Sequence, residues 1–538
     1  MYLRERDDNM KKVKDFFINL IFPAILIPAL VGTIVGIVVF FYKYTWDLIF
    51  KGSLQVYDFI FTHQYLIIIA LLVMVLFSYV QYKVIKIAPE SRGGGIPTSE
   101  GIVRGSLSAN PYVTSVSTII LSYISIFSGL SLGSEGPSVL IGTTVSNMFY
   151  KLLPKGRRAY KRYIMTSGAS TAFAVATGAP ISGILFSLEE IHKKFSPLLI
   201  LVSISAVVSG ILVDYGFSNL MGTSFSMFKD LSIPALPISK SYIFLLVGVV
   251  IGLASIGFSK LVEFFKYLID KKTVKINVYF KILATFILSF VLGLVLRDTL
   301  GGGHSLIVKL INTDISIKLL IGYLVIKLLL ISYSSQSGVT GGMFIPILTI
   351  GAILGSIIAK VCNIEEYRAL VIVVSMASFM GATIGCPLSA IVFSLEALAG
   401  INNIIPIAMS ILISYAVFRL SNSTHVYDIV LERKLKSRYK NKDFLLLEMN
   451  VLVKKSSFAV GKATRDLLLP PNMKISFIQR KDKEHFKMDN VGDKIIEESD
   501  FIIIHAQTYE LDKTRYEIES FFGEQEKFNY HIIQDIKY

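Results

Sequence analysis

Long apolar segments recur along the sequence, and they constrain most strongly what the chain can fold into. Five of them approach or reach the length of about 20 residues that a helix needs to cross a bilayer: Phe22–Phe41, Tyr65–Tyr82, Leu198–Val213, Ile243–Phe258 and Ile282–Leu296. The chain has 538 residues, of which 53% are hydrophobic and 17% charged, whereas about a quarter of the residues of a soluble domain are charged. These features predict a polytopic, all-α membrane protein.

Basic residues gather in the short segments between the apolar ones. They occur in the N-terminal tail, in Lys151–Arg162, at Lys193 and Lys194, in Lys271–Lys275 and in Arg433–Lys442. Basic loops beside membrane helices mark the cytoplasmic side, so we interpret the net charge of +15 as orientation and expect no nucleic-acid partner. We expect a multi-pass protein of the cell (plasma or inner) membrane, with both termini in the cytoplasm. The charged N-terminus has no small-residue cleavage site, so no removable signal peptide is expected.

The sequence gives no sign of enzyme chemistry. It contains no Ser/His pair typical of nucleophilic catalysis, no His cluster with metal-ligand spacing and no Gly-rich phosphate loop. We therefore expect no enzymatic activity, no cofactor and no metal site. Cys362 and Cys386 lie in apolar segments and are interpreted as small core residues, and His304 is interpreted as a hydrogen-bonded residue at a helix end.

Three segments recur in the same order at offsets of 207 to 209 residues. Gly93–Gly95 recurs as Gly301–Gly303, Glu135–Gly142 resembles Phe344–Gly351, and Gly178–Glu189 resembles Gly385–Glu396. One Gly-rich match would be weak, but three matches with constant order and spacing indicate an internal duplication. The two halves cover roughly 16–215 and 240–420.

Duplicated membrane halves with helices interrupted by Gly and Pro are typical of transporters with broken helices. In that architecture the repeats have inverted topology, and helix N-termini meet near the bilayer midplane to hold an anion. The sequence alone does not show inversion, which we infer from the architecture. The predicted fold is therefore an all-α polytopic membrane protein of two inverted-topology repeats with broken and re-entrant helices, followed by a small cytosolic α/β domain.

Glu135 is the first candidate functional residue. It is the only charged side chain between Pro111 and Tyr150, and a carboxylate at membrane depth is costly enough to suggest a function. Pro137 suits the first turn of a helix, so Glu135 is expected at a helix N-terminus, where free N–H groups attract anions. The repeat places Phe344 at its counterpart. The alternative is a helix-capping glutamate in a loop outside the bilayer.

Glu190 is the second candidate. Glu189 is mirrored by Glu396 in the repeat, which favours a structural role for that pair, whereas Glu190 is mirrored by Ala397. Basic clusters flank the uncharged run before Glu190 on both sides, which suits a re-entrant helix pair and places Glu190 at the inner end of a helix. The alternative is an interfacial charge paired with a nearby lysine.

The composition changes after Leu420, and a soluble unit follows a basic linker. Strands are predicted over Leu445–Val453, Lys474–Ile478 and Asp500–His505, and helices over Gly461–Leu467 and Tyr509–Phe522. The predicted domains are a membrane domain at 1–435, a linker at 436–443 and a C-terminal domain at 444–538. A tail of this length suffices for one small domain.

Four motifs together resemble the anion-binding segments of the CLC family of chloride channels and chloride/proton antiporters. They are Gly93-Gly94-Gly95-Ile96-Pro97, Gly133-Ser134-Glu135-Gly136-Pro137, Gly342-Met343-Phe344-Ile345-Pro346 and the late Tyr427. Their order and spacing match the family over nearly all of residues 1–435.

The resemblance implies a homodimer in the lipid membrane with one anion pathway in each subunit. It implies that the backbone at Gly94, Gly95, Gly136, Met343 and Phe344, together with the Tyr427 hydroxyl, binds the anion. Glu135 matches the family's external gating glutamate, and Glu190 matches the internal glutamate that passes protons to the cytoplasm. Family channels usually lack an acid at the second position, so Glu190 favours exchange of chloride for protons.

The chain departs from the family pattern at three positions. Gly94 replaces the usual serine of the first motif, Ser134 replaces a frequent Arg or Lys, and Thr98 replaces an acid. Gly94 leaves the anion selectivity open. A passive anion channel and a fluoride/proton antiporter are the alternatives, and the Glu189–Glu190 pair and Tyr427 favour the chloride branch over the fluoride branch.

The C-terminal tail resembles the TrkA-C (RCK-C) regulatory domain of potassium-uptake regulators. The resemblance rests on short pieces: Val460–Ala463, Leu467–Pro470, Ile478–Arg480 and Glu497–Ile503. It implies a dimerising or ligand-sensing domain, with a small regulatory nucleotide as a candidate ligand but no binding residue that carries over. The alternatives are a passive domain that stabilises the dimer and a protein whose main role is to sense a ligand through this tail.

Overall fold

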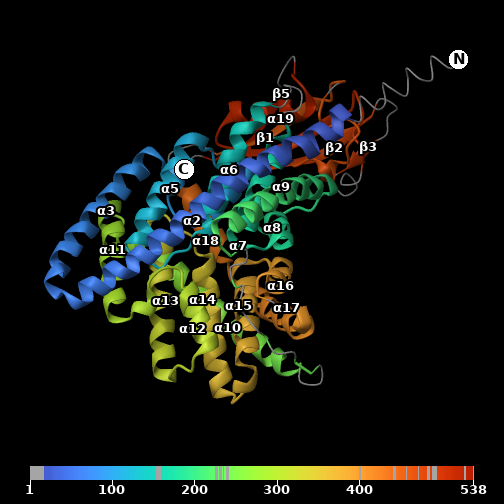
Figure 1. Cartoon of the computed structure of the whole chain (residues 1–538). Coiled ribbons are helices and arrows are strands. Elements are labelled where there is room, and N and C mark those ends of the chain that lie inside the picture. The colour runs from blue at the N-terminus through green and yellow to red at the C-terminus, as the bar shows by residue number, and fades with distance from the viewer. Residues whose placement is uncertain are drawn as a thin grey trace.

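The fold was analysed in a computed structural model of the chain (Figure 1). The residues it describes are 17–152, 159–224, 228, 233, 236–237, 241–398, 401–439, 444–455, 457–470, 472–480, 485–487, 494–525 and 529–536. They form a large helical body with a small sheet-containing domain at one end.

The first half of the body begins with the helices η1 (Phe17–Leu26), α2 (Ile27–Thr62), α3 (Ile67–Ile87), α4 (Ile96–Val103) and α5 (Pro111–Phe127). It continues with α6 (Glu135–Phe149), α7 (Lys161–Thr177), α8 (Pro180–Phe186), η6 (Ser187–His192) and α9 (Pro197–Met221). Short turns of 3-10 helix join these elements at η2 (Gln64–Leu66), η3 (Pro89–Ser91) and η4 (Tyr150–Leu152).

The second half repeats this order. Its helices are α10 (Ile243–Tyr267) with η8 (Leu268–Lys272), α11 (Val278–Val295), α12 (His304–Asn312), α13 (Ile317–Ser337), α14 (Phe344–Val361), α15 (Arg368–Ile384), α16 (Pro387–Glu396) and α17 (Ile404–Leu420). The 3-10 turns are η9 (Arg297–Thr299), η10 (Glu365–Tyr367) and η11 (Ile401–Asn403), and α18 (Val426–Arg438) follows outside the repeat.

The helices have the length and composition of membrane spans. Within the described residues, eight helical segments are long and apolar enough to cross a bilayer, among them Ile21–Thr62, Pro197–Met221 and Phe344–Val361. Other helices, including α4 and α8, are too short to cross, which agrees with the prediction of broken and re-entrant helices. The chain is thus a multi-pass membrane protein.

The two halves pack in the same way. Helix α6 packs on α7 as α14 packs on α15, and α2 packs on α9 as α10 packs on α17. In each half a helix ends at a glycine with left-handed backbone, Gly178 (φ 69°) or Gly385 (φ 96°), and the next helix begins with a proline, Pro180 or Pro387. Gly at this position and Pro in the first turn are favoured at helix ends, so the same sequence signals build the same helical hairpin twice.

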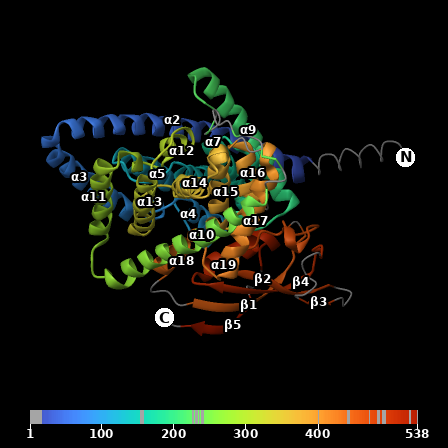
Figure 2. The same cartoon turned by 90° about the horizontal axis from the view of Figure 1, so that it is seen from below.

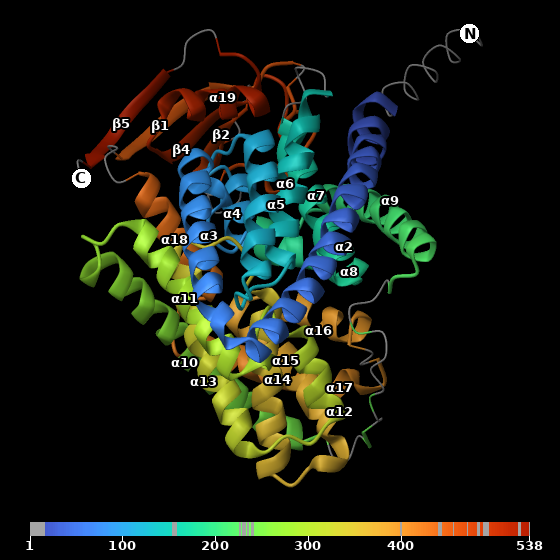
Figure 3. The same cartoon turned by 60° about the vertical axis from the view of Figure 1, so that its left-hand side comes forward.

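The repeats have inverted topology, as predicted. Helices α8 and α16 occupy equivalent positions in the two halves and pack against each other. The C-terminal end of each segment contacts the N-terminus of the other, since Glu189 bonds Ser389 and Glu396 bonds Ser182. Equivalent helices therefore run antiparallel, which is what inversion requires. Figure 3 shows the two halves as separate groups of helices, α2 to α9 above and α10 to α17 below.

The C-terminal domain is a five-stranded sheet with one packed helix. Its strands are β1 (Phe444–Leu452), β2 (Met473–Gln479), β3 (His485–Lys487), β4 (Phe501–Thr508) and β5 (Asn529–Ile536), and α19 (Leu511–Phe522) follows β4. The sheet order is β3-β2-β4-β1-β5 and every described pairing is antiparallel. The three predicted strands and the second predicted helix are confirmed.

Two local predictions are wrong. The helix predicted over Gly461–Leu467 is only the 3-10 turn η12 (Thr464–Asp466), because Gly461 has a left-handed backbone (φ 78°) and donates to the carbonyl of Ile496 at 2.8 Å. Cys386 is buried as expected, but Cys362 is exposed just beyond the end of α14.

The C-terminal domain is fastened to the helical body. Phe458 of the tail packs edge-on against Tyr160 with ring centroids 4.9 Å apart, and it also contacts Tyr163 at the start of α7. Helix α18 continues to Arg438, so the first residues of the predicted linker are helical. Figures 2 and 3 show α18 leading from the body to the sheet. Part of the tail core is thus continuous with the membrane domain.

Candidate anion and proton sites

Three glycine-rich segments meet at the centre of the helical body. The backbones of Gly133 and Gly342 exchange two hydrogen bonds of 2.8 Å, and the N–H of Gly93 donates to the carbonyl of Val339 at 3.1 Å. These segments immediately precede α4, α6 and α14. The N-termini of three helices from both halves therefore converge on one place.

Glycine is required for this convergence. A Cβ atom on Gly95 would collide with the carbonyl of Gly136, and one on Gly136 would collide with the carbonyl of Gly94. Gly95 also has a left-handed backbone with φ of 77°, which other residues rarely adopt. The structure thus brings Gly94, Gly95 and Gly136 close together.

The converging helix ends offer backbone donors. The first N–H groups of a helix have no acceptor within the helix, and the helix dipole adds partial positive charge at that end. Helix α14 begins at Phe344, after Met343, and both residues are buried. The Phe344 ring is fixed by edge-on packing against Phe173 and Phe393, with centroids 5.0 and 5.4 Å apart. Its backbone is therefore held firmly at the meeting point.

Tyr427 lies in the first turn of α18 and is completely buried. Within the described residues its hydroxyl has no hydrogen-bond partner, although buried hydroxyls are normally bonded. The hydroxyl interacts electrostatically with both Glu135 and Glu190, so it belongs to the same buried region as the two candidate carboxylates. A buried donor without a protein acceptor fits an anion such as chloride.

Glu135 is the first residue of α6 and is 2% exposed. One carboxylate oxygen accepts a hydrogen bond of 3.1 Å from the Ser134 hydroxyl, and the other has no partner among the described residues. A Cβ atom on Gly133 would collide with that second oxygen. The carboxylate is buried within the fold, so the alternative of a capping residue in an outside loop is not supported.

Glu135 lines a cavity of about 600 Å³. The cavity also contains Lys43 and Asp47 of α2, Asp214 of α9, and His304. It also includes Gly222 to Ser224, which follow the end of α9. We call it the outer cavity, after the external position that the resemblance implies for Glu135.

Glu190 lies in η6, on the side of the C-terminal domain, and is 2% exposed. One of its oxygens has no partner among the described residues. The nearby Lys193 binds Glu100 and Asp428 instead, at 3.0 and 2.6 Å. The burial of Glu190 does not fit a charge exposed at the membrane interface, although Lys193 acts on it electrostatically.

Sequence reasoning missed several charged residues beside these two glutamates. Lys43 of α2 and Asp214 of α9 line the same cavity as Glu135, and Lys193, at the end of η6, pairs with Glu100 and Asp428. In the sequence Lys193 has only the character of a basic residue in a cytoplasmic loop, and no sequence signal links the five residues. Their proximity depends on tertiary packing between distant helices.

The three departures from the family pattern have structural consequences. Gly94 leaves space, because a Cβ atom there would lie 3.4 Å from the flexible end of Met343. Thr98 is buried, and its hydroxyl accepts a hydrogen bond from Lys434 of α18. Ser134 donates to Glu135 but carries no charge.

Within the described residues, no group of His, Cys, Asp and Glu side chains could hold a metal ion.

Comparisons with known proteins address the same part of the chain. The family model described as voltage gated chloride channel matches residues 74–419. The H(+)/Cl(−) exchange transporter ClcA of Citrobacter koseri is 25% identical over 426 residues, which are 76% of this chain and 88% of that protein. A solved slow cyanobacterial Cl−/H+ antiporter has a TM-score of 0.70 at 20% identity, covering 77% of this chain and 99% of that chain. A eukaryotic CLC transporter has a TM-score of 0.62 at 20% identity, covering 76% of this chain and 74% of that chain.

Proposed function

The chain belongs to the voltage-gated chloride channel family, and we propose that it is an antiporter that exchanges chloride for protons across the membrane. The observation that carries the proposal is the group formed by Glu135, Tyr427 and Glu190. Both carboxylates and the hydroxyl are buried and interact electrostatically, and each carboxylate has an oxygen without a partner among the described residues.

The meeting helix ends suit chloride. An anion that leaves water loses a hydration free energy of many kcal/mol. The site must offset this loss with favourable interactions of similar size. We propose that backbone N–H groups at Gly94, Gly95, Gly136, Met343 and Phe344, with the Tyr427 hydroxyl, supply this stabilisation. Dipoles and N–H groups bind less tightly than a full positive charge would, which lets the ion leave again.

The two glutamates suit proton transfer. Glu135 opens to the outer cavity and Glu190 lies at the end of η6 that faces the C-terminal domain. A carboxylate that leaves the anion path can take a proton from the adjacent solution, and its place is then available to chloride. We assign Glu135 to the outer exchange of protons and Glu190 to the inner exchange. The name of the ClcA relative, an H(+)/Cl(−) exchange transporter, supports the same assignment.

We propose that the protein lies in the cell membrane with both termini in the cytoplasm, and that it forms a homodimer. The basic segments Lys161–Arg162 and Lys193–Lys194 lie on the side of the C-terminal domain, which supports this orientation. Large apolar side chains are exposed on α8, α9, α16 and α17, including Ile181, Leu212 and Leu388, and they would be covered by lipid or by a second copy.

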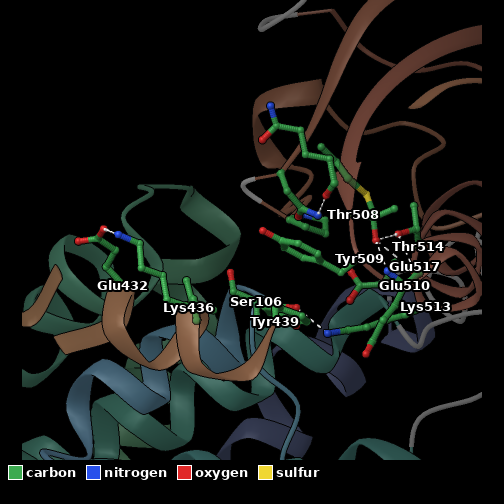
Figure 4. A pocket seen from close by; sticks show the side chains of 16 residues that line it. Ser106, Glu432, Lys436, Tyr439, Thr508, Tyr509, Glu510, Lys513, Thr514 and Glu517 are labelled. Carbon is green, nitrogen blue, oxygen red and sulfur yellow. Dashed lines mark hydrogen bonds and ion pairs between the residues drawn. The ribbon is translucent and has the colours of Figure 1, made fainter. Parts of the chain in front are cut away.

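The C-terminal domain is proposed to regulate transport. A cavity of about 480 Å³ lies between the domain and α18, with Glu432, Lys436 and Tyr439 on one side and tail residues on the other (Figure 4). Tyr439 stacks on Tyr509 of the tail at 4.3 Å. Because Tyr427 lies in the first turn of α18 and Tyr439 directly follows its last residue, movement of the tail would reach the anion path. A small nucleotide is the first ligand to test for a TrkA-C-like domain.

The test of the proposed function is flux through purified protein in liposomes. Vesicles are loaded with chloride, an outward gradient is imposed, and chloride and external pH are recorded together. We expect chloride efflux to drive proton uptake, and Glu135→Ala and Glu190→Ala each to abolish proton movement while chloride still passes. Chloride flux without proton movement in the unmodified protein would identify a passive channel, and transport of fluoride alone would identify a fluoride antiporter.

A further inference from the structure

Lys193 occupies an unusual position at the inner end of the proton path. It follows η6 directly and has a left-handed backbone with φ of 56°, a conformation that is uncommon for residues other than glycine and worth explaining. Its N–H donates to the carbonyl of Leu188 and closes the end of η6. The chain turns here, and the side chain contacts two other helices.

The Lys193 ammonium joins those two helices. It binds the Glu100 carboxylate of α4 at 3.0 Å and the Asp428 carboxylate of α18 at 2.6 Å. The Glu100 side chain is completely buried and also pairs with Arg104, whereas the side chains of Lys193 and Asp428 are 28% and 38% exposed. The cluster therefore leads from solvent at Asp428 to a buried carboxylate at Glu100.

Glu190 belongs electrostatically to the same cluster. It interacts with Lys193, Glu100 and Asp428, and one of its oxygens has no partner within the described residues. The cluster holds three carboxylates and two cations, the second cation being Arg104 on Glu100. One negative charge is left uncompensated in a buried place, which is costly. A proton on Glu190 neutralises it, since Glu100 and Asp428 already have ionic partners.

Two of the three connected elements also carry proposed anion-binding residues. Helix α4 begins after Gly94 and Gly95, and Asp428 directly follows Tyr427 in α18. Lys193 thus links the segment that carries Glu190 to the two helices whose first turns face the anion. A change of charge at Glu190 alters the attraction of Lys193 for Glu100 and Asp428, and so acts on both helices.

We propose that Lys193 is a positioning residue for proton coupling, whose ammonium links Glu190 to the anion-binding helices α4 and α18 through Glu100 and Asp428. This inference rests on the proposed exchange of chloride for protons. A purely structural ion pair is the competing explanation, and it would affect chloride and proton transport equally.

The experiment measures protons moved per chloride in liposomes for the unmodified protein, Lys193→Met, Lys193→Arg and Lys194→Met. Lys194 is exposed and forms no ion pair among the described residues, so it is the matched control. We expect Lys193→Met to lower the ratio by at least about threefold with chloride flux retained, and the other two variants to keep the ratio.

A chemical rescue keeps the test independent of folding. Lys193→Cys is made in a Cys362→Ser background and treated with an ethylammonium methanethiosulfonate, which restores a positive charge, or with the neutral methyl reagent. We expect only the charged reagent to restore the ratio. An unchanged ratio in Lys193→Met, an equal loss of both fluxes, or equal rescue by both reagents would overturn the role of Lys193. Absence of proton movement in the unmodified protein would instead refute the proposed function.

Discussion

Glu189 and Glu396 cap each other's helical segments across the centre of the molecule. Glu189 accepts hydrogen bonds from the backbone N–H and the hydroxyl of Ser389 at 2.8 and 2.7 Å. Glu396 accepts from the backbone N–H groups of Ile181 and Ser182 at 2.9 and 2.7 Å. Each carboxylate thus satisfies the N-terminal donors of the equivalent helix in the other half. The reciprocal contact explains why the repeat retains both residues while Glu190 is not mirrored.

The first prediction separates Glu189 from its neighbour Glu190. Glu189→Gln weakens three charge-assisted hydrogen bonds at a helix N-terminus, one of them from the Leu388 N–H, and Glu396→Gln weakens two. We expect each change to lower the stability of the protein by about 1–2 kcal/mol. We expect the number of protons moved per chloride to stay unchanged. Thermal unfolding in detergent measures the first effect and liposome flux the second. Loss of proton movement in Glu189→Gln with unchanged stability would contradict the structural role.

Much of the site could be predicted from the sequence, because its signals are local. The Gly residues around Glu135 and the following Pro137 define where α6 begins, and the repeat aligns that point with Phe344. The asymmetry between Glu190 and Ala397 separates a candidate proton residue from its structural neighbour. These signals depend on a few adjacent residues, and the internal duplication makes each of them visible twice.

The remaining features depend on packing between distant segments. Arg433–Lys442 has the composition of a solvated basic loop at the cytoplasmic side, but Lys434 bonds Thr98 and Arg438 pairs with Glu90, so α18 is docked against the body. The short strand β3 and the edge strand β5 were also missed. A strand of three residues carries too little periodicity to be identified, and β5 is defined only by its pairing with β1.

The second prediction concerns the missing hydroxyl of the anion site. A Cβ atom on Gly94 would make only ordinary contacts, at 3.4 Å to Met343 and 3.7 Å to Pro97, so the fold should accept Gly94→Ser. One added hydrogen bond is worth about 0.5–1.5 kcal/mol, and we expect chloride to bind roughly twofold to tenfold more tightly. Calorimetric titration of the purified protein with chloride measures this change.

Two further variants control for the added atoms. Gly94→Ala adds the Cβ atom without the hydroxyl, and we expect no gain in chloride affinity. Gly95→Ala would place a Cβ atom against the carbonyl of Gly136 in a left-handed backbone, so we expect a clear loss of folded protein. Equal affinities for Gly94→Ser and Gly94→Ala would mean that the side chain at this position does not reach the anion.

The third prediction concerns Lys43 in the outer cavity. Ser134 leaves the segment before α6 without a positive charge, and Lys43 of α2 lines the same cavity and acts electrostatically on Glu135. We expect Lys43→Met to slow chloride entry from the outer side several-fold at about 0.01 M ionic strength, where charges act over about 30 Å. The difference should shrink near about 1 M salt, where that range is about 3 Å.

Flux measured at both salt concentrations distinguishes attraction from structure. Lys260 pairs with Glu263 on the surface of α10, away from this cavity, and Lys260→Met should leave chloride entry unchanged. A slowing in Lys43→Met that is equal at low and high salt would show that Lys43 acts through packing rather than by attracting the anion.

The fourth prediction concerns the attachment of the C-terminal domain to α7. Arg162 at the start of α7 pairs with Glu517 of α19 and donates to the carbonyl of Leu468 at 2.7 Å. Its side chain is 7% exposed and that of Glu517 is 18% exposed. Removing Glu517 leaves a nearly buried guanidinium without its carboxylate, so we expect Glu517→Ala to weaken docking of the tail by about 1–3 kcal/mol.

Hydrogen exchange of α19 and of the first turn of α7 measures this weakening directly, and a double-mutant cycle isolates the ion pair. Arg162→Ala combined with Glu517→Ala should weaken docking of the tail by less than the sum of the two single changes, because the double variant leaves neither charge without its partner. Glu519 lies on the same helix and pairs with Arg515, whose side chain is 49% exposed. Glu519→Ala should therefore change the protection of α19 against hydrogen exchange by less than about 0.5 kcal/mol.

Since α7 packs on both α6 and α8, loosening of its first turn should also alter chloride flux. Faster exchange of α19 with unchanged flux would show that the tail is anchored here without regulating transport through α7.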